Sequence, residues 1–439
     1  MYHSKMNKKL LEKILDKTAV VGIVGMGYVG LPLVHRFSYK NFKVLGFDID
    51  SQKIEMLNKG KSYIKHISNK KIEFSIKNGF RATAELSEIS SVDVIILCLP
   101  TPLNDDRSPD LSYVINSFNS FSKYLKKNQL ICLESTTYPG TTEEEILPRI
   151  EKEGFKVGED IFLVYSPERE DPSNPIFSTE NIPKVVSGYS SQCLEVGTSL
   201  YSSIINEIVP VTSLRVGEMS KLLENIYRAI NIGLVNEMKI VCDAMDINIH
   251  EVIDAASTKP FGFKPFYPGP GLGGHCIPID PFYLTWKAKK HGVESRFIEL
   301  AGEVNTNMPD WVISKCEQAL ASNGLKLKDS KILILGLAYK KNLDDVRESP
   351  GIEIFSKLLG VTNFLKYSDP HVTEIPKMRK YNLDESSIDL NKETISSFDL
   401  VLLVTDHDDF DYDLISRYSK IIVDTRNRFN ANLENVIKA

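Results

Sequence analysis

The stretch AVVGIVGMGYVG, residues 19–30, decides the fold of this chain. Its apolar first half predicts a buried strand, and the helix-compatible residues 30–39 follow without a spacer. Gly25, Gly27 and Gly30 form a GxGxxG pattern between strand and helix, where free backbone N–H groups can bind a pyrophosphate. We therefore predict a dinucleotide-binding turn; a flavin site, an S-adenosylmethionine site or a tight turn without a ligand are the alternatives.

An acidic residue follows where it can recognise the ribose of the dinucleotide. The next apolar run, residues 43–48, predicts a second strand that ends in Asp48, 18 residues after Gly30. A carboxylate there can accept hydrogen bonds from both ribose hydroxyls and would repel a 2′-phosphate. Asp48 therefore favours NAD over NADP.

Short apolar runs alternate with helical patterns in the first half of the chain and again near its end. Such alternation predicts parallel sheets covered by helices, that is, an α/β fold with two Rossmann-like doubly wound domains. The predicted strands of the first domain are 19–25, 43–48, 92–99, 129–134, 161–165 and 184–188. The predicted strands of the second domain are 331–336, 363–367, 400–405 and 420–424.

The middle of the chain has a different pattern. Residues 213–245 contain no proline and carry apolar residues at three- and four-residue steps, which predicts one long central helix. The Gly/Pro-rich segment 262–281 cannot form a regular helix, and helical character resumes over 282–305. We expect the long helix to join the two α/β halves and to pack against a second subunit.

The overall composition excludes several classes of partner. The 439 residues include 53 Lys+Arg and 58 Asp+Glu, and the net charge of −5 attracts neither nucleic acid nor an anionic membrane surface. No run of about 18 apolar residues and no signal-like N-terminus occurs, so we expect a soluble, cytoplasmic protein. The six cysteines are scattered singly and the eight histidines form no cluster with metal-ligand spacing, which predicts reduced thiols and no metal.

A cysteine lies in the Gly/Pro-rich segment, in the sequence GGHCIPID. The two glycines let the backbone approach a substrate, so we expect Cys276 to be an accessible thiol. Such a thiol can add to an aldehyde, and loss of a second hydride from the thiohemiacetal gives a thioester, so one site can oxidise twice. Asp280 can position or deprotonate a water. In the competing interpretation Cys276 is a small buried residue and Asp280 caps a helix or turn.

Two polar residues share one face of the predicted central helix. Lys221 and Asn225 are four residues apart and therefore project from the same side, one turn apart. The ammonium can stabilise an alkoxide or a tetrahedral oxyanion, and the amide can donate a second hydrogen bond or hold a water. A solvated polar face is the alternative.

Six ordered motifs resemble those of the UDP-sugar 6-dehydrogenase family, whose members convert a nucleotide sugar to its uronic acid. The resemblance spans nearly the whole chain and is strongest to the UDP-N-acetylglucosamine branch. The motifs are GMGYVGLPL (25–33), ESTTYPGTT (134–142), YSPERE (165–170), GEMSKLLENIYRAINIGLVNE (217–237), GPGLGGHCIPIDP (269–281) and GLAYKKNLDDVRESP (336–350).

The resemblance implies three domains and a set of site residues. The domains are a NAD-binding domain at 1–212, a central helical dimerisation domain with the catalytic loop at 213–308, and a UDP-sugar-binding domain at 309–439, in a homodimer. The implied catalytic residues are Cys276 as nucleophile, Lys221, Asn225, Asp280, Glu168 and Thr136. The implied NAD contacts are Gly25, Gly27, Tyr28, Val29, Gly30, Asp48, Lys53, Pro100, Thr101, Ser135, Thr136 and Arg347. The implied substrate contacts are Glu168, Arg169, Lys221, Asn225, Tyr267, Gly269, Gly271, Leu272, Gly273, Tyr339, Lys340 and Arg426.

The same resemblance bears on the sugar. UDP-glucose enzymes of the family typically read GxGFGGxCxxKD in the catalytic loop, and Leu272, His275 and Ile279 depart from that pattern. Ile279 replaces a polar contact beside the catalytic acid with an apolar one, which favours UDP-N-acetylglucosamine as substrate. The resemblance also implies a product that supplies surface polysaccharide synthesis. UDP-N-acetylgalactosamine, UDP-N-acetylmannosamine and UDP-glucose remain open.

Two other functions compete with this one. A single-step alcohol dehydrogenase would form one NADH per substrate and need no thiol. A non-catalytic sensor would bind the nucleotide sugar or NAD and only shift its two α/β halves. A sensor would not require the set Cys276, Asp280, Lys221 and Asn225, which argues against that function. For the enzyme, we expect closure of the two domains to bring the reacting atoms of NAD and the sugar within about 3–3.5 Å.

Overall fold

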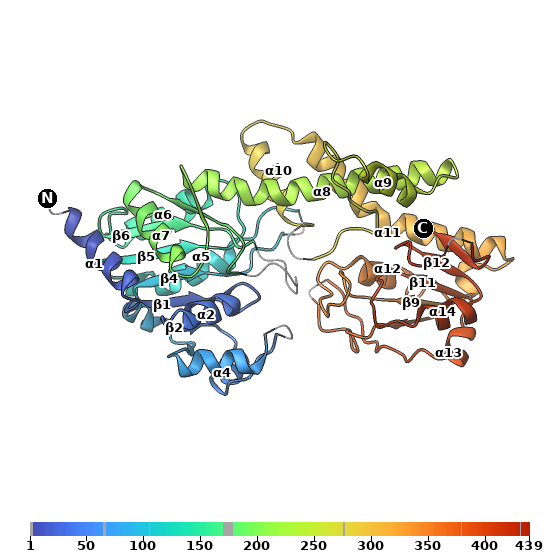
Figure 1. Cartoon of the computed structure of the whole chain (residues 1–439), viewed down its shortest axis with the longest axis horizontal. Coiled ribbons are helices and arrows are strands. Elements are labelled where there is room, and N and C mark those ends of the chain that lie inside the picture. The colour runs from blue at the N-terminus through green and yellow to red at the C-terminus, as the bar shows by residue number, and fades with distance from the viewer. Residues whose placement is uncertain are drawn as a thin grey trace. The chain divides into compact units, whose positions relative to one another are not determined.

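The computed structural model describes residues 3–64, 67–104, 106–169, 179–274, 277–378, 380–430 and 432–439. The chain divides into two compact units, which are Met1–Glu224 with Trp286–Gly292, and Asn225–Thr285 with Val293–Ala439. Each unit is built on a parallel-rich β-sheet (Figure 1).

The sheet of the first unit has the strand order β3-β2-β1-β4-β5-β6-β7-β8 and is parallel except between β6 and β7. The order reverses between β1 and β4, and in open α/β sheets ligands bind beside such a reversal, at the carboxyl ends of the strands. The strands are β1 Val20–Val24, β2 Lys43–Phe47, β3 Arg81–Thr83, β4 Val94–Leu97, β5 Gln129–Leu133, β6 Ile161–Tyr165, β7 Lys184–Gly188 and β8 Ile208–Val211.

Every residue of β4, β5 and β6 is buried, as expected for strands that helices cover on both faces. Figure 1 shows helices of this unit packed around the sheet. They are α1 His3–Leu15, α2 Gly30–Tyr39, α3 Ser51–Asn58, α4 Asn69–Lys77, α5 Ser112–Phe121, α6 Leu147–Lys152 and α7 Ser191–Ser202.

The sheet of the second unit is entirely parallel, with the order β10-β9-β11-β12-β13. Its side chains alternate between two hydrophobic cores. Ile332 and Ile334 pack with α11 and α12, whereas Leu333 and Leu335 pack with α13 and α14 on the other face. The elements are α11 Arg296–Ser322, β9 Lys331–Leu335, α12 Pro350–Leu358, β10 Phe364–Ser368, α13 Lys392–Ser396, β11 Leu400–Leu403, α14 Tyr412–Tyr418, β12 Ile422–Asp424 and β13 Val436–Lys438.

The predicted long helix is observed as α8, Leu214–Ala244, and α9, Ile249–Ser257, follows it. The expected helical stretch at 282–305 is instead two helices, because residues 291–295 interrupt it with Gly292 at a positive φ of 72°. The first of these is α10, Asp280–Lys290, and the second, α11, runs without a break through residue 308, where a domain boundary was predicted.

The predicted fold class is confirmed, and each of the ten predicted strands overlaps an observed one. The three strands that the sequence analysis missed, β3, β8 and β13, all lie at the edges of the sheets. They were missed because β3 and β13 have only three residues each, one of them charged, and because the apolar run of β8 is short and contains Pro210. In the described parts of the chain, no helix combines the length and the apolar character that crossing a membrane would require.

Candidate active site

The turn between β1 and α2 depends on its first and last glycines. Gly25 has a positive φ of 95°, and a Cβ atom on it would lie 2.5 Å from the carbonyl oxygen of Cys98. A Cβ on Gly30 would lie 1.9 Å from the carbonyl oxygen of Gly25. By contrast, a Cβ on Gly27 would meet no atom within 4 Å. The backbone at Gly27 therefore borders open space at the start of α2, as a pyrophosphate-binding turn requires.

Asp48 lies directly after β2 and is half-buried beside this turn. Its Oδ2 accepts a hydrogen bond from the backbone N–H of Met26 at 3.0 Å, and its Oδ1 accepts one from Asp50 at 3.0 Å. The Tyr63 hydroxyl donates to the Met26 carbonyl, and burial, assisted by the negative charge of Asp48, raises the pKa of Tyr63. The carboxylate and the open glycine turn together fit the adenosine side of NAD.

Residues at the ends of β4 and β5 are joined by hydrogen bonds. The hydroxyl of Thr101 donates to the carbonyl oxygen of Thr136 at 2.8 Å, and the backbone N–H of Leu99 donates to the hydroxyl of Ser135 at 2.9 Å. The structure thus brings together the predicted NAD contacts 100–101 and 135–136 at the carboxyl edge of the sheet. Lys53, another predicted contact, lies on α3 with its Nζ 3.9 Å from Asp50 Oδ2.

The segment after β6 meets the first turns of α8. The buried Lys221 ammonium donates to the backbone carbonyl of Glu168 at 2.5 Å and lies 3.8 Å from its Oε2. Arg169 forms an ion pair with Glu224 at 2.7 Å. The predicted pair Glu168 and Lys221 is therefore in contact, with the carboxylate and the ammonium on the same side of the segment.

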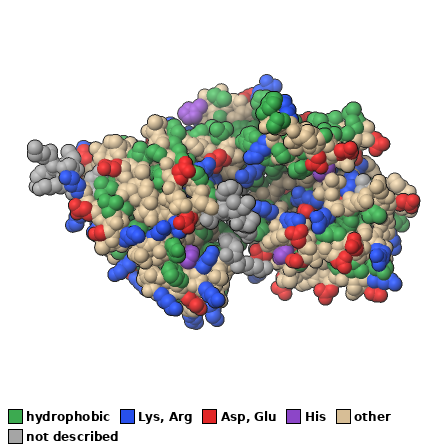
Figure 2. All heavy atoms as spheres, viewed as in Figure 1, with side chains coloured by type: hydrophobic (Ala, Val, Ile, Leu, Met, Phe, Trp, Pro, Cys, Tyr) green, Lys and Arg blue, Asp and Glu red, His purple; other side chains and the backbone are tan. Residues whose placement is uncertain are grey.

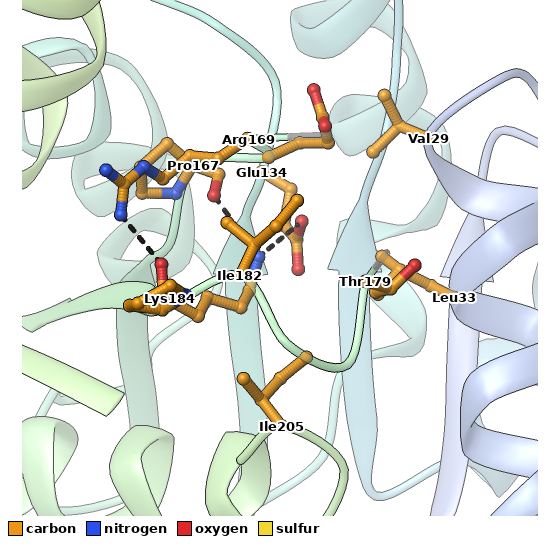
Figure 3. A pocket seen from close by; sticks show the side chains of 11 residues that line it. Val29, Leu33, Glu134, Pro167, Arg169, Thr179, Ile182, Lys184 and Ile205 are labelled. Atoms are coloured by element: carbon orange, nitrogen blue, oxygen red, sulfur yellow. Dashed lines mark hydrogen bonds and ion pairs between the residues drawn. The ribbon is translucent and has the colours of Figure 1, made fainter. Parts of the chain in front are cut away.

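A pocket lies between this segment and the start of α2 (Figure 3). Val29 of the glycine turn and Leu33 of α2 line it together with Glu168, so it connects the dinucleotide turn with the predicted acid. Figure 3 also shows Lys184 directed at Glu134, at 3.0 Å, and at the Pro167 carbonyl. The pocket therefore has a buried ion pair in its wall, which the sequence analysis missed.

Burial raises the pKa of Glu134, although Lys184 and the Tyr201 hydroxyl both bind it, the latter at 2.5 Å. The sequence signal for this pair was a carboxylate directly after the apolar run 130–133, because a buried charge requires a partner. The sequence did not show which residues are the partners of Glu134, because Lys184 and Tyr201 are 50 and 67 residues away along the chain.

Asn225 and Asp280, both buried, are hydrogen-bonded in the second unit. The Asn225 amide donates to Asp280 Oδ2 at 2.5 Å. Asp280 is the first residue of α10, where the positive end of the helix dipole stabilises a carboxylate. The predicted nucleophile Cys276 and its neighbour His275 lie outside the described residues. The Asn225–Asp280 contact thus places two of the predicted catalytic groups together.

The glycine-rich loop is attached at both of its ends. Gly269 donates its N–H to Asn236 Oδ1 at 2.9 Å, and a Cβ on it would lie 2.6 Å from Arg426 Nη1. At the other end a Cβ on Gly273 would lie 2.5 Å from Tyr339 Cβ. Arg426, Tyr339 and the loop are therefore neighbours, as the predicted substrate site requires.

Further predicted substrate contacts lie in this loop or next to Tyr339 along the chain. Gly271 and Leu272 are half-buried, and Lys340 is exposed. The exposed Tyr267 donates its hydroxyl to Asp254 at 2.7 Å and stacks on His250. Arg347, a predicted NAD contact, binds both carboxylate oxygens of Asp345 through its own side chain. Their roles remain predictions.

Glu218 was not predicted, although it lies on the same face of α8 as Lys221. The buried carboxylate accepts hydrogen bonds from the N–H of Gly140 at 2.5 Å and from the N–H and hydroxyl of Thr142 at 2.9 and 2.7 Å. Burial raises its pKa to about 7, against these three donors, which lower it. Glu218 therefore anchors the end of the motif that begins at Glu134 and carries Thr136. Within the described residues no group of acidic, histidine and cysteine side chains is arranged to hold a metal ion.

The chain matches the UDP-glucose/GDP-mannose dehydrogenase family over most of its length. The match comprises the NAD binding domain at residues 19–205, the central domain at 215–307 and the UDP binding domain at 333–431. The domain boundaries at 212/213 and 308/309 remain predictions.

Curated relatives are similar over nearly the whole chain. A UDP-N-acetyl-D-glucosamine 6-dehydrogenase of Pseudomonas aeruginosa is 33% identical, over 90% of this chain and 92% of its own length. A UDP-N-acetyl-D-mannosamine dehydrogenase of Campylobacter jejuni is 32% identical, over 89% and 96%. The solved structure of the UDP-D-ManNAc dehydrogenase of Pyrococcus horikoshii superposes with a TM-score of 0.87 at 28% identity, over 95% and 98%.

Alanine substitutions at Gly25 and Gly27 should have different effects on stability and on NAD binding. Gly25→Ala should lower the free energy of unfolding by roughly 2 kcal/mol or more, because both the φ angle and the Cys98 carbonyl oppose a side chain. Gly27→Ala should change it by less than about 0.5 kcal/mol and yet weaken NAD binding about tenfold or more, because its methyl group would occupy the space left for the cofactor. Denaturant titration and calorimetric NAD binding measure both; unchanged NAD affinity in Gly27→Ala would contradict the assignment of the turn.

Glu218 should make stability depend on pH. Its pKa is raised from 4.5 to about 7 in the folded state, so the folded protein binds the extra proton and the free energy of unfolding falls as pH rises across that range. Relative to Glu218→Gln, the wild type should lose roughly 3 kcal/mol between pH 4.5 and 7.5. Urea titrations at several pH values test this, with Glu237→Gln, an exposed carboxyl on the same helix, as the control. A difference between wild type and Glu218→Gln that does not vary with pH would refute it.

Proposed function

We propose, from the premise that the chain belongs to the UDP-glucose/GDP-mannose dehydrogenase family, that it oxidises C6 of a UDP-N-acetylhexosamine twice, with UDP-N-acetylglucosamine as substrate. The chain is a NAD-dependent oxidoreductase of nucleotide sugars. The sugar, the covalent route and the residue roles are the proposed part.

The contact between Asn225 and Asp280 carries this proposal. The Asn225 amide donates a hydrogen bond to the Asp280 carboxylate at the start of α10. Asp280 follows the proposed nucleophile, Cys276, by four residues in the sequence. One helical turn earlier on α8 stands Lys221, whose ammonium is adjacent to Glu168. A single alcohol oxidation would need a base and a cation, but a water-positioning amide and a second acid suit a step in which a thioester is hydrolysed.

The proposed first step removes two electrons from the C6 alcohol. Glu168 accepts the hydroxyl proton, directly or through a water, while Lys221 stabilises the negative charge on the oxygen. NAD, when bound, accepts one hydride in each of the two oxidations. The first oxidation leaves an aldehyde at C6.

The proposed second step passes through sulfur. The thiolate of Cys276 adds to the aldehyde carbon, and Lys221 and Asn225 stabilise the resulting oxyanion. Loss of a second hydride converts the thiohemiacetal to a thioester. Water then attacks, Asp280 accepts its proton, and the carboxylate leaves as the thiol is restored. In sum, one alcohol, one water and two NAD give one carboxylate, two NADH and three protons.

The choice of sugar rests on the loop between Leu272 and Ile279. Ile279 is buried immediately before Asp280 and presents an apolar side chain where UDP-glucose enzymes tend to have lysine. An apolar contact there disfavours a site built around a sugar hydroxyl and suits an N-acetylated sugar. The relatives bear both the glucosamine and the mannosamine names, so the mannosamine and galactosamine epimers are the alternatives to test.

We further propose a homodimer formed through α8, in a cytoplasmic protein. Six apolar side chains recur along this helix and at the residue after it, at steps of three, four or seven residues, and each is exposed by 38–63%. Such a stripe fits the same stripe of a second copy, as in a helical dimer interface. Figure 2 shows hydrophobic side chains gathered over the end of α8 and over α9. The stripe is Leu223, Tyr227, Leu234, Met238, Val241 and Met245.

Replacing the proposed nucleophile tests the covalent route. Cys276→Ser should abolish release of the uronic acid and formation of the second NADH, because an alcohol does not form the thioester. NAD affinity should stay as in the wild type, since the dinucleotide turn belongs to the other unit. Rapid-quench product analysis measures release of the acid, and calorimetry measures NAD affinity. The control is Cys242→Ser, which replaces another cysteine of the chain. Acid release at the wild-type rate from Cys276→Ser would remove sulfur from the mechanism.

Charge on the apolar stripe tests the dimer. The double variant Leu234→Asp/Met238→Asp should sediment as a monomer at micromolar concentration, because two carboxylates would have to be buried in the interface. Leu15→Asp, at a more exposed apolar position on α1, should leave the mass unchanged. A double variant that remains dimeric would place the interface elsewhere.

A further inference from the structure

One buried carboxylate of the second unit, that of Asp369, accepts hydrogen bonds from four backbone N–H groups. Asp369 follows β10 and is buried. Its Oδ2 accepts hydrogen bonds from the N–H groups of Leu337 at 2.7 Å and Ala338 at 3.0 Å. Its Oδ1 accepts from His371 at 2.8 Å and Val372 at 3.0 Å. Asp369 therefore anchors the start of the segment that follows β9.

The same construction occurs at the NAD turn of the first unit. There the first strand ends in a glycine with positive φ, and an aspartate after the second strand accepts from the N–H of the next residue. In the second unit Gly336 has a φ of 83°, and a Cβ on it would lie 2.4 Å from the carbonyl oxygen of Thr405. Asp369 thus corresponds to Asp48, but it is buried whereas Asp48 is half-buried.

His407 is a further hydrogen-bond partner of Asp369. The imidazole is completely buried, and its Nε2 lies 3.2 Å from Asp369 Oδ2. Its Nδ1 accepts a hydrogen bond from the backbone N–H of Asn342 at 2.9 Å. A backbone N–H only donates, so Nδ1 is the acceptor and Nε2 carries the hydrogen that is donated to Asp369. The ring therefore bridges the two ends of residues 337–342.

The bridged segment contains the predicted substrate contacts Tyr339 and Lys340. The Tyr339 ring also packs against Gly274 of the catalytic loop, where a Cβ would lie 3.0 Å from its Cε2. Gly274 in turn donates its N–H to the carbonyl of Arg347 at 3.0 Å. A shift of the segment would therefore move both the substrate contacts and the wall of the glycine-rich loop.

We propose that His407 is a positioning residue for the UDP-sugar, which holds residues 337–342 in place by joining Asp369 to the backbone of Asn342. The inference rests on the proposed function, because it takes these residues as nucleotide-sugar contacts. A carboxylate offers about four acceptor sites, and Asp369 already accepts five hydrogen bonds. Asp369 therefore has no acceptor left for ribose hydroxyls, unlike Asp48 in the first unit, which accepts two backbone hydrogen bonds.

Two substitutions separate the two hydrogen bonds of the ring. In His407→Asn the amide oxygen can take the place of Nδ1 and keep the bond from Asn342. In His407→Gln the amide nitrogen can take the place of Nε2 and keep only the bond to Asp369. The side chain of Asn342 exchanges two hydrogen bonds with Asp408. Because Asp369 already binds Leu337 and Ala338 by itself, we expect the bond from the backbone of Asn342 to His407 to contribute more to the position of the segment than the bond from His407 to Asp369.

The test measures UDP binding by calorimetry and the KM for the UDP-sugar and for NAD. His407→Gln and His407→Ala should raise the UDP Kd and the UDP-sugar KM about tenfold, the effect of a lost buried hydrogen bond, with the NAD KM unchanged. His407→Asn should stay within about threefold of the wild type. Hydrogen exchange should be faster in peptides covering 337–349 of the Gln variant but not of the Asn variant.

Three outcomes would overturn the inference. They are wild-type UDP affinity in both His407→Gln and His407→Ala, equal losses in the Asn and Gln variants, and a parallel rise in the NAD KM, which would indicate general destabilisation. Failure of the proposed function has a different signature, since the wild type would then form no NADH from any UDP-sugar while the UDP affinities of the variants would still report on His407.

Discussion

The described structure depends on one buried stripe of α8, along which polar side chains bind four different segments. Glu218 holds the residues 140–142, Lys221 the segment after β6, Asn225 the acid at the start of α10, and Asn236 the glycine-rich loop. Each of these side chains is buried, and a buried polar group without a partner costs roughly 1–3 kcal/mol. The helix therefore stabilises the fold only if each segment lies where its partner requires, and the same contacts that satisfy these groups arrange the proposed site.

A second constraint operates at the carboxyl edge of each sheet. In both units a strand ends in a glycine with positive φ, and an aspartate after the neighbouring strand accepts from the backbone N–H that follows. The two turns differ in what surrounds the aspartate. Asp48 is half-buried next to open space at Gly27, whereas His407 covers Asp369. We therefore propose that one backbone design supports the NAD site in one unit and holds the nucleotide-sugar contacts in the other.

Most of the fold and part of the site could be predicted from the sequence, because their signals are local. Apolar runs, the GxGxxG turn and the period of α8 lie within about 30 residues, and they predicted the strands, the cofactor and the Lys221/Asn225 face. The buried pairs Glu134–Lys184, Glu218–Thr142 and His407–Asp369 join residues 50, 76 and 38 positions apart, so only the folded chain shows them. The edge strands β3 and β13 were missed because three residues are too few for a periodic signal, and β8 because Pro210 interrupts its short apolar run. The break between α10 and α11 was missed because Gly292 is a single residue within a helical pattern.

The central claim is that one site oxidises the same carbon twice. The most direct measurement counts NADH formed per sugar consumed when the purified protein is incubated with excess NAD and, separately, with UDP-N-acetylglucosamine, UDP-N-acetylgalactosamine, UDP-N-acetylmannosamine and UDP-glucose. The account predicts two NADH for each UDP-N-acetylglucosamine converted to its uronic acid, and slower turnover of the other three. One NADH per sugar with an aldehyde or ketone product, or tight binding without NADH, would contradict it.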